Sequence, residues 1–213
     1  MARRLDPSGW HVFHAGGAIV HAETAESRGD AVPTESIGKA AELADDRGWT
    51  LEFYTADAYA LNNSSDRAID HAALMGVPFE QRDLGSLADP IVRLQFVVSE
   101  ADSPEVLGHA NALGLTGTSA TSPIMPGTAF VSFTVEGVTK ATGIGLIADQ
   151  LGIGMADVMM VGDGHNDLPA LAAVGHPVAM GNAVDEAKEL AQLIVADVEL
   201  DGVVEALEAS AGR

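Results

Sequence analysis

The sequence predicts a protein of the α/β class. Segments with the alternating pattern of strands and segments with the helical spacing of apolar residues follow each other along the chain. A continuous apolar run at residues 158–161 ends in Gly-Asp-Gly directly before another helix-like segment, which is typical of a strand buried on both faces of a parallel sheet. The chain has 213 residues, of which 47% are hydrophobic and 20% charged, so it can form one or two domains with a substantial core.

Residues 24–133 alternate between the two patterns. Pro33 begins a helix whose apolar face contains Ile37, Ala40 and Ala44, and the next glycine after that face ends it. The further segments are predicted, in order, as a strand at 49–55, a helix at 65–75, a strand at 91–98, a helix at 103–113 and a strand at 129–135. The intervening stretch at 116–128 is rich in Ser, Thr, Gly and Pro and is predicted to form a loop.

From residue 139 onward, helices alternate with short apolar strands. The helices are predicted near residues 139–151, 166–174, 184–191 and 200–209. The sequence contains no internal repeat and no long linker, so the alternation expected of an α/β protein continues to its end.

Two aspartates follow the continuous apolar run. Gly162 and Gly164 allow the backbone to turn at the strand end, where ligands of open α/β sheets bind. Asn166 is predicted to cap the next helix and Asp167 to lie in its first turn, so that Asp163 and Asp167 converge. Two close carboxylates repel each other unless a cation lies between them, and oxygen ligands with waters suit Mg²⁺ better than Zn²⁺. The same residues also fit a solvated turn followed by a helix cap.

The composition excludes several classes of function. The chain contains no cysteine, which excludes disulfides, thiolate metal sites and a cysteine nucleophile. A net charge of -20 argues against nucleic acid and anionic membranes as partners, because counterion release requires a basic surface. The sequence has no signal peptide and no apolar run of about 18 residues, so the predicted location is the cytoplasm. Because the chain is acidic, the binding of a phosphate ester would have to depend on local positive groups.

The segment at 158–171 resembles the fourth motif of the haloacid dehalogenase-like (HAD) phosphatases, in the Gly-Asp-x-x-Asn-Asp form of the Cof-type branch. Further resemblances follow in the order of that family. Residues 137–140, Gly-Val-Thr-Lys, resemble its lysine motif, residues 178–183 its next strand and loop, and residues 201–203 the start of its last helix. Together these motifs cover about the last third of the chain.

This resemblance implies a HAD Rossmann-like core with an inserted α+β cap. In that family the cap covers the active site and selects the substrate. The core is then expected at residues 1–23 and 134–213, incomplete at its amino terminus, and the cap domain at residues 24–133. Asp57 and Tyr59, which follow a predicted cap strand, are specificity candidates, although a surface loop would explain them equally.

The resemblance also implies roles for four residues of these motifs. Lys140 would neutralise the phosphoryl group and hold the attacking aspartate, and Asn166 would hydrogen-bond the substrate phosphate or a metal-bound oxygen. Asp163 would bind Mg²⁺ directly, and Asp167 would complete the metal site by orienting that ligand or a coordinated water. His165 occupies a variable position of the motif and is expected to face solvent.

The reaction implied is the Mg²⁺-dependent hydrolysis of a small phosphorylated metabolite, such as a sugar phosphate, through an aspartyl-phosphate. The family forms that intermediate on the first aspartate of an Asp-x-Asp motif near the amino terminus, and no two aspartates here stand two apart. Residues 10–20 instead resemble the family's third strand, with Gly16 at its usual asparagine position. The segment that bears the nucleophile is therefore expected to be missing, and the chain as written is predicted to be inactive.

Two other functions stay open. One is a shortened HAD-like module that binds metal or phosphate, or regulates, without chemistry; the other is a degenerate product. The missing segment would supply a central strand, so its loss would expose an apolar sheet edge, and the chain would aggregate or pair with another copy. A homo-oligomer is thus left open, as is the physiological substrate.

Overall fold

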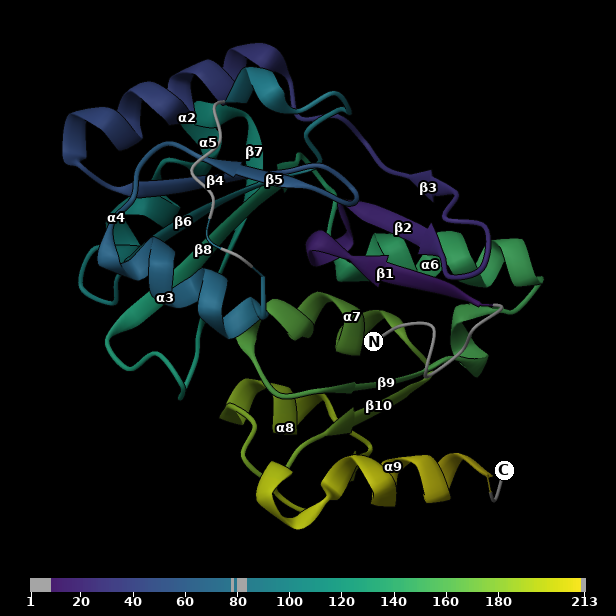
Figure 1. Ribbon diagram of the computed structural model, residues 1–213. Helices are drawn as coiled ribbons and strands as arrows, with labels where there is room; N and C mark the ends of the chain where they lie inside the picture. Colours follow the sequence, from purple (N-terminus) through teal and green to yellow (C-terminus); the bar gives the residue numbers. More distant parts are fainter. Residues whose placement is uncertain (1–8, 78, 80–83, 212–213) are drawn as a thin grey trace. The chain divides into compact units, whose positions relative to one another are not determined.

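The computed structural model describes residues 9–77, 79 and 84–211, which form a mixture of helices and strands (Figure 1). They divide into two compact units, the first reaching to Val138 and the second beginning at Thr139. Each unit has its own β-structure and its own buried cluster of apolar residues. The division into a core at 1–23 and 134–213 and a cap at 24–133 remains a prediction.

The first unit is built on a five-stranded antiparallel sheet with the order β5-β4-β6-β8-β7. Its strands are β4 (Thr50–Tyr54), β5 (Tyr59–Leu61), β6 (Arg93–Ser99), β7 (Leu115–Thr121) and β8 (Thr128–Val135). The most deeply buried side chains of one face are Leu51, Phe53, Leu94, Phe96 and Phe133. This face therefore forms the apolar core of the unit.

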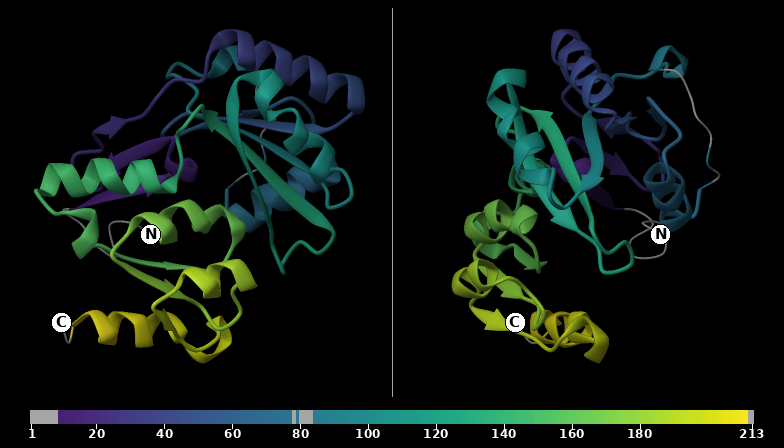
Figure 2. Two further views of the ribbon diagram at one scale, coloured as in Figure 1. Left: turned by 180° about the vertical axis from the view of Figure 1, so that it is seen from behind. Right: turned by 90° about the vertical axis from the view of Figure 1, so that its left-hand side faces the viewer.

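Helices cover both faces of that sheet, but unequally (Figure 2). The apolar face packs against α2 (Thr34–Arg47), α4 (Ser103–Gly108) and α5 (Ala110–Leu113) through residues such as Ala40 and Val106. The other face contacts α3 (Asp66–Met75), and the short helix η2 (Leu84–Ser86) follows further along the chain. Alternate strand residues point to opposite faces, so the second face carries Glu52, Tyr54, Arg93 and Gln95.

The amino-terminal segment folds as a hairpin and a short third strand: β1 (Trp10–Phe13), η1 (His14–Gly16), β2 (Ala18–His21) and β3 (Ser27–Arg28). The single strand expected from residues 10–20 is thus replaced by two antiparallel strands. The backbone is left-handed at His14, Ala15 and Gly16, which reverses the chain. Gly17 follows, where a Cβ would lie 2.5 Å from the carbonyl oxygen of Val92.

The second unit contains a three-stranded parallel sheet with the order β11-β10-β9. The strands are β9 (Met159–Gly162), β10 (His176–Ala179) and β11 (Leu193–Ile194), and the helices are α6 (Lys140–Leu151), η3 (Met155–Asp157), η4 (His165–Asp167), α7 (Leu168–Ala173), α8 (Asp185–Leu190), η5 (Val198–Leu200) and α9 (Gly202–Ala211). Leu171, Val178 and Ala187 lie in the core of this unit.

Strand β9 departs from its prediction. The run at 158–161 was expected to be buried on both faces, yet Met159, Met160 and Val161 are only partly buried. The reason is position: among the described residues β9 pairs with β10 alone and forms the edge of the sheet.

The predicted helices all form, most of them within two residues of their expected ends, but two predictions for the first unit are wrong. Residues 116–128 were predicted as a loop, and residues 115–121 form β7 on the edge beside β8. A Cβ at Gly117 would lie 2.8 Å from Phe133, so close packing against β8 holds a strand of small polar residues. The helix expected at 103–113 is split at His109 into α4 and α5.

None of the helices in the described part of the chain is both long enough and apolar enough to cross a membrane.

Candidate functional site

The carboxyl end of β9 forms a tight corner. The strand ends at Gly162, and Asp163 and Gly164 connect it to η4. A Cβ at Gly162 would lie 2.7 Å from the Cβ of Asp167, and one at Gly164 would lie 2.8 Å from Oδ1 of Asn166. Neither glycine has a positive φ, so both are needed for close approach to the residues that follow rather than for an unusual turn.

Asp167 holds this corner together from a buried position, with 4% of its surface exposed. Its Oδ2 accepts hydrogen bonds from the backbone amides of Asp163 (3.1 Å) and Gly164 (3.2 Å), and its Oδ1 accepts one from Nζ of Lys140. Both carboxylate oxygens therefore have partners within the chain. Such a carboxylate is well stabilised as an anion and fixes the position of the groups around it.

Lys140 is the first residue of α6, as predicted. Thr139 precedes the helix, and its backbone amide donates a hydrogen bond to Oγ1 of Thr142 (3.0 Å) in a capping box. A lysine at a helix amino terminus is disfavoured by the helix dipole, and the sequence therefore called for a nearby anion. Asp167 is that anion, and the side chain of Lys140 remains 29% exposed beside it.

The side chains of Asp163 and Asn166 take no part in this ion pair. Asp163 is exposed, and its Oδ2 has a long contact of 3.5 Å with Nδ2 of Asn182. Asn166 was predicted to cap the following helix, and this is wrong: it lies inside η4, while Gly164 precedes η4 and Asp167 precedes α7. Its amide has no hydrogen-bond partner in the described parts of the chain and stays available. His165 is exposed, as predicted.

The corner can offer a cation one free carboxylate. Asp163 and Asp167 carry two negative charges and Lys140 one positive charge, so a net negative charge remains at Asp163. In the described residues no group of three or more His, Cys, Asp or Glu side chains could hold a metal. Mg²⁺ is often held by one or two carboxylates, with waters and substrate phosphates completing its shell, so Asp163 fits that ion. Asp167 would act mainly by positioning.

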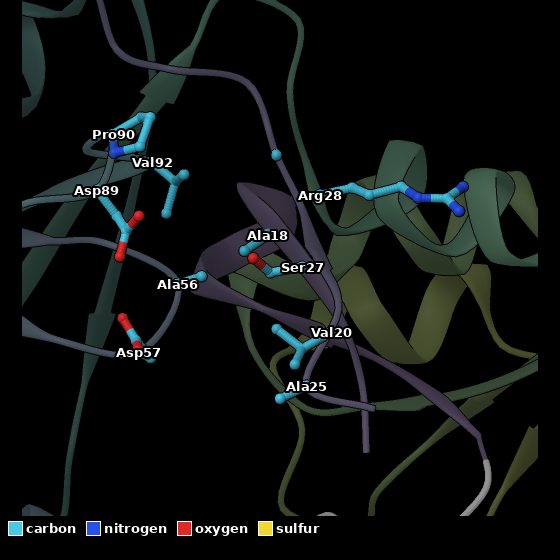
Figure 3. A pocket seen from close by; sticks show the side chains of 11 residues that line it. Ala18, Val20, Ala25, Ser27, Arg28, Ala56, Asp57, Asp89, Pro90 and Val92 are labelled. Atoms are coloured by element: carbon cyan, nitrogen blue, oxygen red, sulfur yellow. The ribbon is translucent and has the colours of Figure 1, made fainter. Parts of the chain in front are cut away.

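A separate cavity of about 380 Å³ lies in the first unit (Figure 3). Its walls include Ala18, Val92 and Pro90, and its polar groups include Asp57 and Asp89, whose carboxylates point toward one another. Asp57 was a specificity candidate from the sequence and does line a cavity. Its Oδ1 accepts a hydrogen bond from the Thr55 hydroxyl, at 3.1 Å. Tyr59, the other candidate, does not line it.

Residues 8–207 match the family of haloacid dehalogenase-like hydrolases. The chain belongs to this family. The family and the α/β fold class predicted from the motifs are thereby confirmed, while the predicted absence of an amino-terminal Asp-x-Asp segment stays a prediction.

Two curated relatives resemble parts of this HAD-like chain. A putative phosphatase of Bacillus subtilis, YkrA, is 42% identical over 73 residues, which are 34% of this chain and 28% of that protein. A phosphoglycolate phosphatase of Halorubrum lacusprofundi is 39% identical over 66 residues, which are 31% of this chain and 29% of that protein. The matched segments thus span less than a third of the length of these relatives.

Solved structures resemble the HAD-like chain over nearly its whole length. A sugar phosphatase of HAD subclass IIB superimposes with a TM-score of 0.81 at 22% identity, covering 98% of this chain and 77% of that one. A haloacid dehalogenase-like hydrolase from Bacteroides thetaiotaomicron gives a TM-score of 0.78 at 24% identity, covering 95% and 76%. At these identities the likeness shows the shared fold.

The HAD-like chain also contains a buried polar network that the sequence analysis missed. Glu52 is fully buried on the second face of the five-stranded sheet. Its Oε1 contacts Nδ1 of His71 at 2.8 Å, and its Oε2 accepts from the Tyr54 hydroxyl (2.7 Å) and from Nε2 of Gln95 (2.9 Å). Gln95 in turn accepts from the Ser132 hydroxyl (3.1 Å). The available signal was a glutamate within an otherwise strand-like run.

His14 lies at the margin of this network, with its ring centroid 5.3 Å from that of Tyr54. Burial, assisted by the positive charge of Arg93, lowers the pKa of His14 from 6.5 to about 4. The unfolded chain therefore binds a proton first as the pH falls. Stability from this group is complete above pH 6.5 and is lost as the pH falls toward 4, with about 2 to 3 kcal/mol lost by pH 4.5.

This expectation is checked by urea unfolding followed by tryptophan fluorescence at pH 7 and pH 4.5. The two tryptophans, Trp10 and Trp49, both belong to the first unit, so the signal reports that unit. His14→Asn keeps a residue that tolerates the left-handed backbone and removes the titrating ring. Its stability should depend less on pH by the stated amount, and equal pH dependence in both proteins would contradict the assignment.

Proposed function

We propose that this chain is part of a Mg²⁺-dependent phosphatase that hydrolyses a small phosphorylated metabolite, such as a sugar phosphate. The observation that carries the proposal is the exposed carboxylate of Asp163 beside the partly buried Lys140–Asp167 ion pair. This is a corner with a spare negative charge at the end of a parallel strand, where α/β proteins bind ligands.

Each residue of the corner has a distinct part in the proposal. Asp163 contacts the cation, and Asp167 fixes both the loop amides and the ammonium group of Lys140. Bound Mg²⁺ supplies positive charge that a phosphate group needs in a chain of net charge -20. Lys140 supplies a second positive charge, and the free amide of Asn166 donates to a phosphate oxygen.

The names of the relatives support a phosphoester as the substrate. The curated relatives include a phosphoglycolate phosphatase and a putative phosphatase, and a structural relative is described as a sugar phosphatase. We propose further that the attacking aspartate comes from a segment outside this chain, because the sequence has no Asp-x-Asp pair. By itself the chain would then bind without catalysing.

A binding or regulatory module is the second candidate function. The observation that favours it is that Asp167 is fully engaged by Lys140 and two amides, which leaves Asp163 as the free carboxylate of the corner. A free carboxylate and a free amide can bind a cation and a phosphate. They supply no nucleophile, so this module would bind ligands without turnover.

Calorimetric titration with Mg²⁺ tests the metal site shared by both candidates. Wild-type chain is expected to bind Mg²⁺ in the millimolar range or tighter, and Asp163→Asn to weaken binding by about tenfold or more. Asp149→Asn, an exposed carboxylate on α6 of the same unit, removes the same charge and should change binding less than about twofold. No binding to wild-type chain, or equal binding to both variants, would sink the metal site.

Hydrolysis of p-nitrophenyl phosphate with Mg²⁺ separates the two functions. The isolated chain is expected to show no turnover. Turnover that disappears in Asp163→Asn would show a nucleophile inside the chain and would contradict the proposal that it lies outside. If the chain extended at its amino terminus gains turnover, the enzyme is supported; if the extended protein binds Mg²⁺ and stays inactive, the binding module is supported.

A further inference from the structure

The second face of the five-stranded sheet carries an arginine whose Nε has no hydrogen-bond partner among the described residues. On this face Arg93 lies opposite Tyr54 in the β4–β6 pairing, and its guanidinium carbon lies 4.1 Å from the centre of the Tyr54 ring. Among the buried side-chain nitrogen and oxygen atoms of residues 9–77, 79 and 84–211, Nε of Arg93 lacks a hydrogen-bond partner. A buried N–H donor without a partner costs free energy, so something else must compensate it when it is kept.

The carboxylate of Glu52 acts on Arg93 through its charge but does not accept a hydrogen bond from its Nε. Glu52 accepts from His71, Tyr54 and Gln95, so both of its oxygens already have donors. Arg93 forms no ion pair with a carboxylate in the described part of the chain. Both oxygens of Glu52 are thus occupied, and Nε of Arg93 is left without a partner among the described residues.

The surroundings of Arg93 hold it in place and leave it reachable. The Tyr54 hydroxyl is tied to Glu52, and the Tyr59 ring stacks on the Tyr54 ring with centroids 5.9 Å apart. Arg93, Tyr59 and His14 each keep partial exposure to solvent. His14 is neutral near pH 7 because its pKa is about 4. Burial lowers the pKa of Arg93 although Tyr54 and Glu52 act in the opposite direction, so a further anion would favour its charged form.

We propose that Arg93 is the anchor of an anion site in the first unit, which takes the carboxylate or phosphate group of a small ligand. The planar guanidinium offers several N–H donors that match the oxygens of such groups, and the Tyr54 ring below it fixes its plane. The residues of this site lie within the first unit, and none of them belongs to the corner at β9. Either proposal can therefore be wrong while the other holds.

Binding of two simple anions tests the site. Sodium malonate and inorganic phosphate are titrated separately by calorimetry into chain from which divalent cations have been removed by dialysis, so that no Mg²⁺ occupies the corner of the second unit. At least one anion is expected to bind in the millimolar range or tighter. Arg93→Gln should weaken that binding by about 10-fold to 100-fold, the loss of a charge-assisted contact. Malonate alone would identify a carboxylate site, and phosphate alone a phosphate site.

The matched control is Arg67→Gln on α3, which removes an exposed arginine of the same unit and the same charge. It should change anion binding by less than about twofold. Equal loss in Arg93→Gln and Arg67→Gln would show general charge attraction and overturn the site.

A measurement on the unaltered chain covers the case in which Arg93→Gln does not fold. With ¹⁵N-arginine labelling, the Nε–H resonance of Arg93 is expected to shift on addition of the anion, with saturation. It is assigned with Arg93→Lys, which keeps the charge. An Nε–H resonance that does not respond to either anion would also overturn the proposal.

Discussion

Replacing Glu52 by alanine is expected to lower the free energy of unfolding of the first unit by about 3 to 5 kcal/mol. The side chain is fully buried, and three groups lose their acceptor at once: His71, Tyr54 and Gln95. Buried donors thereby lose their strongest acceptor, and the removed volume leaves a cavity beside them. Urea unfolding followed by fluorescence of Trp10 and Trp49 measures the loss.

Two comparisons separate the network from charge and volume. Glu42→Ala removes an exposed carboxylate from α2 and is expected to change stability by less than about 0.5 kcal/mol. Glu52→Gln keeps the volume but replaces one acceptor oxygen by a donor, so it should lose part of the stability and less than Glu52→Ala. A loss below about 1 kcal/mol for Glu52→Ala would contradict this expectation. It would mean that the three donors find other partners in the folded variant.

The network shows where sequence reasoning stops. Helix α2 was predicted closely because its start, apolar spacing and terminal glycine are all local signals. The partners of Glu52 lie 19 residues away at His71 and 43 residues away at Gln95. Only the register of β4 against β6 and the position of α3 bring them together, and no local pattern contains that information.

The prediction for the residues of strand β7 was wrong for a related reason. Its residues are small and polar, so composition favours a loop, and the strand exists because β8 offers an edge that pairs with it from Leu115 to Thr121. The β9 corner was more predictable, since Asp163, Lys140 and Asp167 belong to motifs whose order could be read. Which of the two carboxylates stays free depends on hydrogen bonds between a side chain and the backbone, and the motif alone does not indicate these bonds.

The second large effect is expected in the other unit, at Lys140. Lys140→Met keeps the length of the side chain and removes the charge, so the buried carboxylate of Asp167 loses its counter-charge and keeps only two amide donors. We expect the free energy of unfolding of the second unit to fall by about 2 to 4 kcal/mol. The unit contains no tryptophan or tyrosine, so far-UV circular dichroism and hydrogen exchange at the amides of Asp163 and Gly164 are the suitable measurements.

A double-mutant cycle decides whether the loss comes from the ion pair. If it does, Asp167→Asn should reduce the cost of Lys140→Met to about 1 kcal/mol, with a coupling energy of about 1 to 3 kcal/mol between the two positions. Lys188→Met on α8 removes the same charge from the same unit and should cost less than about 0.5 kcal/mol. Additive losses would show that Lys140 stabilises the unit through its stem. Coupled losses, together with faster exchange at the two amides, would show that one ion pair both stabilises the unit and fixes the loop from which Asp163 faces solvent.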